Sequence, residues 1–248
     1  MNPFIAELIG TALLLMMGCG VVANLTLNKT KGTGFNWLAN TTAWALAVFI
    51  SVTISGPYSG AHFSPAITIG MAIQGCFPWS DVLPYIVAQM LGGALGAFMV
   101  WLLYKDHFDQ TTDDPGKLLG IFCTSPAIKN HPRNFFVEVV ATFVMMFVVF
   151  HVTGAELTLN DGEETLPIGL GSIGALPVAF TVWAIGLSLG GLTGYAINPA
   201  RDFGPRVMHA ILPIKGKGSS EWDYAWIPVV APIVGASLAA LAYNLLQS

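Results

Sequence analysis

The stretch Gly190-Gly-Leu-Thr-Gly-Tyr-Ala-Ile-Asn198-Pro199-Ala200-Arg201-Asp202-Phe-Gly-Pro-Arg206 decides the fold of this chain. It follows an uncharged apolar run over residues 168–189, long enough to cross a bilayer at about 1.5 Å per residue. The glycines interrupt a helix, and Asn198-Pro199 then predicts a new helix with Asn as its N-cap and Pro as its first residue. A short charged helix beside full spans indicates a re-entrant loop, because irregular backbone survives at membrane depth only where it lines a cavity or is buried in protein. The stretch therefore predicts a pore.

A weaker copy of the pattern lies earlier, at Gly56-Pro-Tyr-Ser-Gly-Ala-His62-Phe-Ser64-Pro65-Ala66-Ile-Thr-Ile-Gly70. Ser64-Pro65-Ala66 aligns with Asn198-Pro199-Ala200 at an offset of 134 residues. Glu7-Leu-Ile-Gly-Thr11 aligns with Glu138-Val-Val-Ala-Thr142 at an offset of 131. The agreement of the two offsets indicates an internal repeat. Each copy holds an odd number of spans, so the second is expected to be inverted relative to the first, as in many membrane pathways.

The composition is typical of a polytopic membrane protein. Of the 248 residues, 54% are hydrophobic and 10% charged, whereas a soluble domain carries about 25% charged residues. The net charge is −4, and no basic run suggests a nucleic-acid partner. The three cysteines lack the spacing of a metal site, and their odd number argues against a disulfide framework. We expect no cofactor and no metal.

These observations predict an all-α membrane protein with six transmembrane helices and two re-entrant half-helices. The spans are expected at about residues 3–22, 37–54, 82–104, 134–152, 168–189 and 225–246, and the first half-helix at about 65–74. Pro177, inside the fifth span, predicts a kink. The Ser125-Pro126-Ala127 tripeptide lies in a polar loop, and we interpret its likeness to the half-helix motifs as coincidence.

The repeat predicts a single channel domain over residues 1–248. Its parts are a first repeat at about 3–104, a connecting loop over 105–132 and an inverted second repeat at about 134–246. A carboxylate inside a span is expensive and by default functional. We interpret Glu7 and Glu138 as supports that accept backbone N–H groups from the two re-entrant loops.

The motifs resemble those of the aquaporin superfamily. Glu7-x-x-Gly-Thr, Ser59-Gly-Ala-His-x-Ser-Pro-Ala and Thr193-Gly-Tyr-Ala-Ile-Asn-Pro-Ala-Arg-Asp carry the resemblance, which covers nearly the whole chain. Asp202, directly after Arg201, and the Pro228-Val229 pair resemble the glycerol-facilitator branch. One residue departs from the pattern, since the family has Asn in its first motif where this chain has Ser64. Ser caps helices about as well as Asn, so the first half-helix is still expected to form.

The resemblance implies the residues of a pore. The implied selectivity filter consists of Trp44, Gly186, Tyr195 and Arg201. Without the resemblance, Trp44 would be interpreted as an interface anchor or core filler, and His62 as a satisfied buried histidine. The half-helix motifs at the midplane are Ser64, Pro65, Ala66, Asn198, Pro199 and Ala200. Backbone carbonyls would face the channel from Gly60, Ala61, His62, Phe63, Gly194, Ala196 and Ile197. Gly186 is expected to give width, whereas Tyr195 replaces a Phe found in many glycerol facilitators and adds a hydroxyl.

The expected function is a passive channel for glycerol, other small neutral solutes and water that excludes ions and protons. A mainly water-selective channel, or one for urea, hydrogen peroxide or metalloids, stays open as an alternative. An ion-coupled transporter is a remote alternative, because no embedded acidic relay exists beyond Glu7 and Glu138. An enzyme is not expected, because His62 and Ser64 lie two apart on a loop and diverge.

The resemblance also implies a homotetramer in the cell membrane with both termini cytoplasmic. The distribution of basic residues opposes this orientation. Cytoplasmic termini would place the following basic residues in or beside loops outside the cell: Lys29, Lys31, Lys105, Lys117, Lys129, Arg133, Lys215 and Lys217. The positive-inside rule predicts the reverse. We favour cytoplasmic termini, because the filter and half-helix pattern is the more specific signal.

Overall fold

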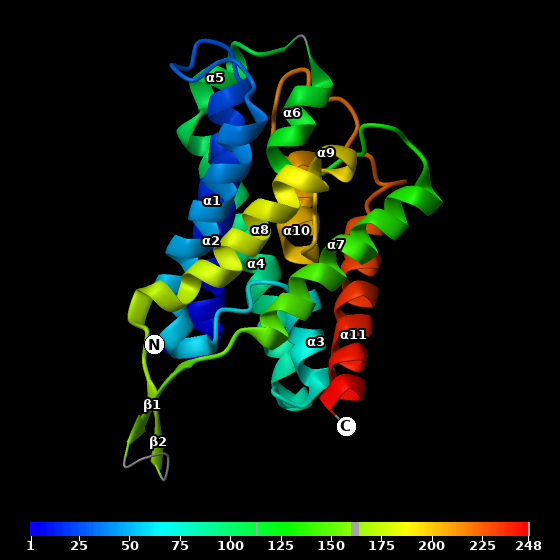
Figure 1. Ribbon diagram of the computed structural model, residues 1–248. Coiled ribbons are helices and arrows are strands. Elements are labelled where there is room, and N and C mark those ends of the chain that lie inside the picture. The colour runs from blue at the N-terminus through cyan, green and yellow to red at the C-terminus, as the bar shows by residue number, and fades with distance from the viewer. Residues whose placement is uncertain (113, 160–163, 248) are drawn as a thin grey trace.

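The computed structural model describes residues 1–112, 114–159 and 164–247, which form a bundle of helices with one small hairpin (Figure 1). Six segments of the described chain are long and apolar enough to cross a membrane. They are α1 (Pro3–Thr26), α2 (Trp37–Ser59), α4 (Trp79–Leu103), α7 (His131–His151), the segment of η2 (Gly171–Ala175) with α8 (Leu176–Ser188), and α11 (Ile227–Gln247). The expected all-α fold with six spans is confirmed.

Two shorter helices occupy the half-helix positions. They are α3 (Pro65–Gln74) and α10 (Pro199–Ile211), the second preceded by the single turn α9 (Gly190–Thr193). Each packs against a span from the other half of the chain, α3 on α11 and α10 on α4. The two halves therefore interlock through their half-helices.

Small residues bring the spans into close contact. A Cβ atom on Gly92 of α4 would lie 2.5 Å from the Leu8 carbonyl oxygen of α1, and one on Gly235 of α11 would lie 2.4 Å from the Val139 oxygen of α7. Such glycines let membrane helices approach backbone to backbone. The α1–α4 and α7–α11 pairs form matching scaffolds on the two sides of the molecule.

Both termini lie at one end of the bundle, and the hairpin lies at that end too (Figure 1). At the opposite end the segment predicted as a connecting loop contains, in its described part, α5 (Lys105–Asp109) and α6 (Pro115–Phe122). This end also holds the loops that follow α1 and α10. The charged residues therefore gather beyond the ends of the apolar spans.

The fifth span begins later than expected. Ile168, predicted to start it, belongs to β2 (Glu164–Ile168), which pairs antiparallel with β1 (Ala155–Leu159). Pro177 lies in the first turn of α8. The backbone N–H that proline lacks would have no partner within the helix at this position. The expectation that Pro177 kinks a continuous helix is wrong, because residues 169–170 are not helical and residues 171–175 form the 3-10 turn η2.

Candidate functional site

The two re-entrant loops share one backbone conformation. Positive φ angles occur at matching positions, separated by the same 134-residue offset as the sequence motifs: Gly60 (78°), Ala61 (56°), Phe63 (54°), Gly194 (84°), Tyr195 (39°) and Ile197 (45°). Residues with a Cβ rarely adopt this region, and each costs roughly 1–3 kcal/mol. The surrounding structure must therefore hold both loops in place.

Glu7 and Glu138 provide that support. The Glu7 carboxylate accepts hydrogen bonds from the backbone N–H groups of His62 (2.9 Å) and Phe63 (2.7 Å). The Glu138 carboxylate accepts from those of Ala196 and Ile197, both at 2.9 Å. Each buried carboxylate thus satisfies two successive amides of a strained loop, which is the arrangement expected from the sequence.

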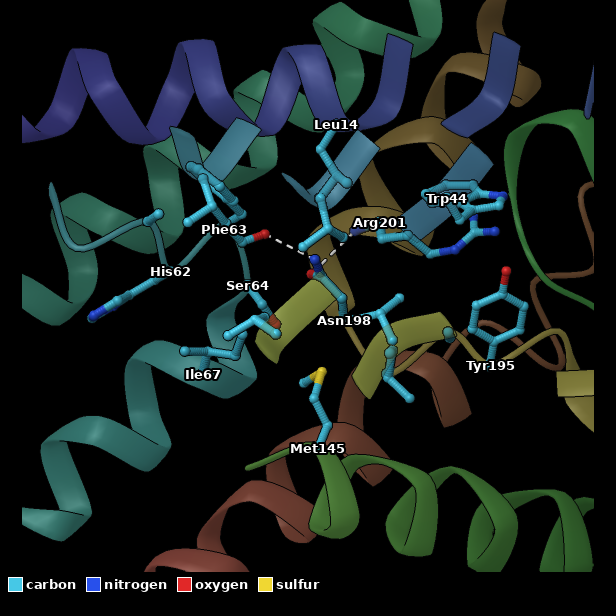
Figure 2. Close-up of a pocket in the computed structure, with 17 residues that line it drawn as sticks. Leu14, Trp44, His62, Phe63, Ser64, Ile67, Met145, Tyr195, Asn198 and Arg201 are labelled. Carbon is cyan, nitrogen blue, oxygen red and sulfur yellow. Dashed lines mark hydrogen bonds between the residues drawn. The ribbon is translucent and has the colours of Figure 1, made fainter. Parts of the chain in front are cut away.

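Asn198 joins the two loops at the centre of the molecule. Its Oδ1 accepts from the N–H groups of Ala200 (2.9 Å) and Arg201 (3.2 Å), capping α10. Its Nδ2 donates to the carbonyl oxygen of Phe63 at 2.8 Å (Figure 2). The cap fixes the direction of the Asn198 amide.

Ser64 occupies the matching N-cap position of α3 but does not act in the same way. Its side chain makes no cap bond, and its hydroxyl has no hydrogen-bond partner among the described residues. The half-helix nevertheless forms over the expected residues, with Thr68 N–H donating to the Ser64 carbonyl at 3.0 Å. The hydroxyl remains free beside the interior cavity, which Ser64 lines.

That interior cavity has a volume of about 70 Å³, enough for a few water molecules at about 10–15 Å³ each. One side is lined by backbone of the two loops. The other is apolar and is lined by Leu14, Val48, Val52, Met145, Val178 and Val182. The cavity is therefore bordered by the two loops on one side and by hydrocarbon on the other.

Three residues separate this cavity from a wider vestibule of about 410 Å³ at the end of the bundle opposite the termini. Trp44, Tyr195 and Arg201 line both spaces and so form the constriction between them. The Arg201 Cζ atom lies 4.2 Å from the centroid of the Trp44 ring, a cation–π contact. Figure 2 shows the Tyr195 hydroxyl pointing toward this pair.

Polar atoms at the constriction lack partners. Trp44 Nε1, the Tyr195 hydroxyl and Arg201 Nη1 make no hydrogen bond within the described part of the chain, although the three residues are 4%, 5% and 8% exposed. Unpaired buried polar atoms cost free energy, and each calls for an explanation.

Gly186 contributes to the constriction indirectly. A Cβ atom on it would lie 3.0 Å from Tyr195 Cζ and 3.0 Å from Thr41 Cγ2, and its carbonyl accepts a bond from Trp37 Nε1 at 3.0 Å. A side chain at position 186 would therefore meet the ring of Tyr195, which packs into the space that the glycine leaves.

Asp202 lies behind the constriction in a buried network that the sequence analysis did not anticipate. It accepts from Arg206 Nε (2.8 Å) and from both the N–H and the hydroxyl of Thr124 (2.7 Å each). Arg206 also donates to the carbonyls of Thr124 and Ser220, each at 2.7 Å. The network ties two loops to α10, and the spacing of Asp202 and Arg206 by one helical turn was its only sequence signal.

The loop that contains Thr124 folds over the second re-entrant loop. A Cβ atom on Gly194 would lie 3.0 Å from Thr124 Cβ, and the Ala127 N–H donates to the Leu192 carbonyl at 3.0 Å. The Ser125-Pro126-Ala127 segment is therefore a structural cover of the vestibule and forms no half-helix.

The first re-entrant loop has a different network, also missed from the sequence. Gln89 Nε2 donates to Glu7 Oε2 (2.7 Å) and to the Thr68 hydroxyl (2.9 Å), and the Tyr85 hydroxyl donates to the Ser59 carbonyl (3.0 Å). His62 lines the cavity, with its Nδ1 3.1 Å from the Thr68 hydroxyl. Side chains of α4 thus buttress the first loop.

Charged groups at the vestibule end secure the outer loops. Lys129 Nζ lies 2.9 Å from an Asp223 carboxylate oxygen, and this hydrogen bond raises the pKa of Lys129 and lowers that of Asp223. Lys217 Nζ donates to the carbonyls of His209, Ala210 and Leu212 at the end of α10, and burial lowers its pKa. A cation there also complements the C-terminal end of the α10 dipole.

Comparison with known proteins identifies this architecture. Residues 1–243 match the family described as Major intrinsic protein. The chain belongs to the major intrinsic protein family. It is 48% identical over 244 residues to the probable glycerol uptake facilitator protein of Thermotoga maritima, covering 98% of this chain and 99% of that protein. It is 46% identical over 245 residues to the glycerol uptake facilitator protein of Streptococcus pneumoniae strain R6, covering 99% of each.

Among solved structures, the X-ray structure of the aquaglyceroporin from Plasmodium falciparum is similar, with a TM-score of 0.80 and 28% identity. The match covers 98% of this chain and 94% of that one. The resemblance inferred from the motifs is confirmed. This major intrinsic protein is an integral membrane protein of a family of channels and facilitators, with six spans in its described part.

Proposed function

We propose that this protein is a passive channel that conducts glycerol and excludes ions and protons. The observation that carries the proposal is the constriction, where unpartnered donors on Trp44 and Arg201 face a narrow passage walled by two aromatic rings. The names of the two relatives, both glycerol uptake facilitators, support the same solute.

Glycerol fits the chemistry of the constriction. Each hydroxyl that leaves water without a new hydrogen bond costs roughly 2–7 kcal/mol. Arg201 Nη1 and Trp44 Nε1 donate to hydroxyl oxygens, while the faces of Trp44 and Tyr195 cover the CH groups. Trp44, Gly186, Tyr195 and Arg201 thus act together as the selectivity filter, with Gly186 acting through the position of Tyr195.

Beyond the filter, the loop carbonyls replace lost water on one wall of the cavity. Residues 60–63 and 194–197 supply these carbonyls, from loops whose backbone is left-handed at matching positions. Asn198 uses one amide hydrogen for Phe63 and keeps the second for the solute. The free Ser64 hydroxyl offers one further donor at the same level.

Positive potential at two levels excludes cations and protons. The N-terminal ends of α3 and α10 point partial positive charge at the midplane. Arg201 adds a full charge at the constriction, with no ion pair to an acidic group among the described residues. A cation would have to lose its hydration shell and would be repelled by this field, whereas a neutral polyol carries no net charge for the field to repel.

A comparison of water, glycerol and urea permeability in proteoliposomes by stopped-flow light scattering tests this function. We expect glycerol flux well above that of empty vesicles, weakly saturating and indifferent to a proton gradient. Flux of water alone would favour the water-selective alternative, and faster urea than glycerol would favour another neutral solute. Dependence on the proton gradient would favour a coupled transporter.

We also propose that the chain is one domain of two inverted repeats, 3–104 and 134–246, joined by 105–132, and that four copies assemble. The matched φ angles of the two re-entrant loops support the repeat. The resemblance of the loop motifs to those of the aquaporin superfamily supports the tetramer. Chemical cross-linking of the purified protein tests the assembly. A ladder that ends at four copies supports a tetramer, and a lone monomer contradicts it.

We propose further that the protein lies in the cell membrane with both termini in the cytoplasm. Cys76 gives a direct test, because it is exposed and follows α3 at the end of the bundle that holds the termini, while Cys19 and Cys123 are buried. An impermeant maleimide should label Cys76 only after intact cells are permeabilised. Labelling of intact cells that Cys76→Ser abolishes would show the opposite orientation, which the distribution of lysines favours.

A further inference from the structure

We propose that Asn40 determines specificity at the vestibule side of the constriction, where its side-chain oxygen accepts a hydrogen bond from the entering solute. This inference rests on the proposed function as a glycerol channel. It adds an acceptor beside the unpartnered side-chain groups of the filter, of which Trp44 Nε1 and Arg201 Nη1 only donate and the Tyr195 hydroxyl can donate or accept.

The position of Asn40 is the first argument. It lies on α2 one helical turn before Trp44, so the two side chains share one face of the helix. Asn40 lines the vestibule together with Trp44, Tyr195 and Arg201. The side chain therefore stands beside the point where a solute leaves the vestibule for the constriction.

The missing hydrogen bond is the second argument. Asn40 is only 5% exposed, and its Oδ1 has no hydrogen-bond partner within the described residues. A buried carboxamide oxygen without a partner is costly, and polar side chains in membrane helices are generally functional. Its neighbour Trp37 shows the contrast, because Trp37 Nε1 is satisfied by the Gly186 carbonyl at 3.0 Å.

The chemistry defines the kind of solute that benefits. Arg201 and Trp44 can donate to oxygen atoms but cannot accept a hydrogen, so a hydroxyl bound by them alone still loses its own donated bond. The Asn40 oxygen accepts that hydrogen. A polyol, which presents neighbouring hydroxyls that donate and accept, uses both kinds of group at once, whereas a solute without donor hydrogens gains nothing from Asn40.

The test replaces Asn40 in two opposite ways. Asn40→Leu removes the acceptor with a similarly branched but bulkier side chain, and Asn40→Ala removes it while opening space. Because the two changes alter volume differently, a loss common to both identifies the missing acceptor rather than a steric block. Ser51→Ala is the matched control, since Ser51 lies on the same helix, is buried and unpartnered, and lines none of the cavities described above.

Glycerol and water permeability are measured in one proteoliposome preparation for each variant. We expect both Asn40 variants to lower the glycerol-to-water ratio by about three- to tenfold, the effect of one lost hydrogen bond, and Ser51→Ala to leave it within twofold. A ratio within twofold of the parent in either folded Asn40 variant would overturn the role of Asn40. A parent that conducts no glycerol would instead overturn the proposed function.

Discussion

The two re-entrant loops have the same backbone but are held by different means. Both place left-handed residues at equivalent positions, and in both the backbone N–H groups donate to a buried glutamate. The second loop adds the Asn198 cap and its bond to Phe63. The first has an unbonded Ser64 hydroxyl and relies on the α4 side chains of Gln89 and Tyr85 instead.

This difference separates what the fold requires from what the pore adds. The backbone pattern and the carboxylate occur in both loops, so they are the common requirement for a re-entrant half-helix. The side-chain cap occurs in only one. Tyr195 and Arg201 belong to or follow the second loop, so the loop with the fixed cap also positions two residues of the constriction.

Removing a supporting glutamate should produce the largest effect and break the feature that the loops share. Glu138→Ala and Glu7→Ala each leave two buried N–H groups unpaired, at roughly 1–3 kcal/mol per group. We expect each to lower the free energy of unfolding by about 2–6 kcal/mol, seen as a lower Tm in detergent by fluorescence-detected size exclusion. Glu156→Gln, on the exposed strand β1, is the control. An unchanged Tm for Glu138→Ala would show that the loop does not depend on it.

Replacing Arg201 should abolish the electrostatic contribution of the second loop. Arg201→Val removes the charge at the constriction and a donor to glycerol, so we expect measurable cation or proton leakage and at least a tenfold loss of the glycerol-to-water ratio. Decay of a pH gradient in vesicles containing a trapped dye reports the leak. Arg133→Gln, in the exposed first turn of α7, should behave like the parent. Unchanged ion and proton conductance in Arg201→Val would show that Arg201 does not contribute to the barrier against ions.

Substitutions at the two cap positions should change stability by different amounts, and the larger of these changes is of intermediate size. Asn198→Ala removes the cap and the bond to Phe63, which together are worth about 1–3 kcal/mol. Ser64→Ala removes a hydroxyl with no bonded partner in the described structure and should change stability by less than about 0.5 kcal/mol. Equal losses in the two variants, measured by thermal unfolding, would contradict the asymmetry between the loops.

Ser64→Asn tests the same contrast by adding a cap to the first half-helix instead of removing one from the second. The added carboxamide can cap α3 as Asn198 caps α10, so we expect a gain of about 0.5–2 kcal/mol and glycerol flux within a few-fold of the parent. Stopped-flow measurement beside the parent checks the flux. A parent without flux that this substitution rescues would show that Ser64 disables the pore.

Tyr195→Phe should give the smallest effect. The hydroxyl has no partner in the described structure, so its removal should leave the Tm nearly unchanged. It also removes an anchor for a competing water molecule, and we expect the glycerol-to-water ratio to rise about two- to threefold, on the order of one weak hydrogen bond. A fall in the ratio would instead make the hydroxyl a binding group for the solute.

The repeat, the half-helices and the two glutamates could be read from the sequence because each leaves a local signal. Asn-Pro marks a capped helix start, and the paired offsets mark duplication. Membrane spans have long uniform hydropathy, so five of the six were located well. The fifth failed at its start because Ile168, the last hairpin residue, and residues 169–170, which are not helical, belong to the same apolar run.

The supports of the site left weaker signals because they join distant segments. Gln89 and Glu7 are 82 residues apart, and Thr124 and Asp202 are 78 apart. No spacing rule connects such positions. Gly186 was matched to the filter, but its missing side chain faces the Tyr195 ring, a relation that only the packing shows. Asn40 leaves no sequence signal, because an Asn near a helix start is ordinarily a structural residue.

The glycerol-to-water permeability ratio of Gly186→His, measured beside the parent in one vesicle preparation, tests the constriction most directly. A side chain at position 186 must take the space of the Tyr195 ring, since even a Cβ atom there lies 3.0 Å from Cζ. The displaced ring or the new imidazole then narrows the passage beside Arg201. We expect the parent to conduct glycerol. The glycerol flux of Gly186→His should be at least tenfold lower than that of the parent, while most of the water permeability is kept. A ratio that does not move would place the selective point of this channel elsewhere.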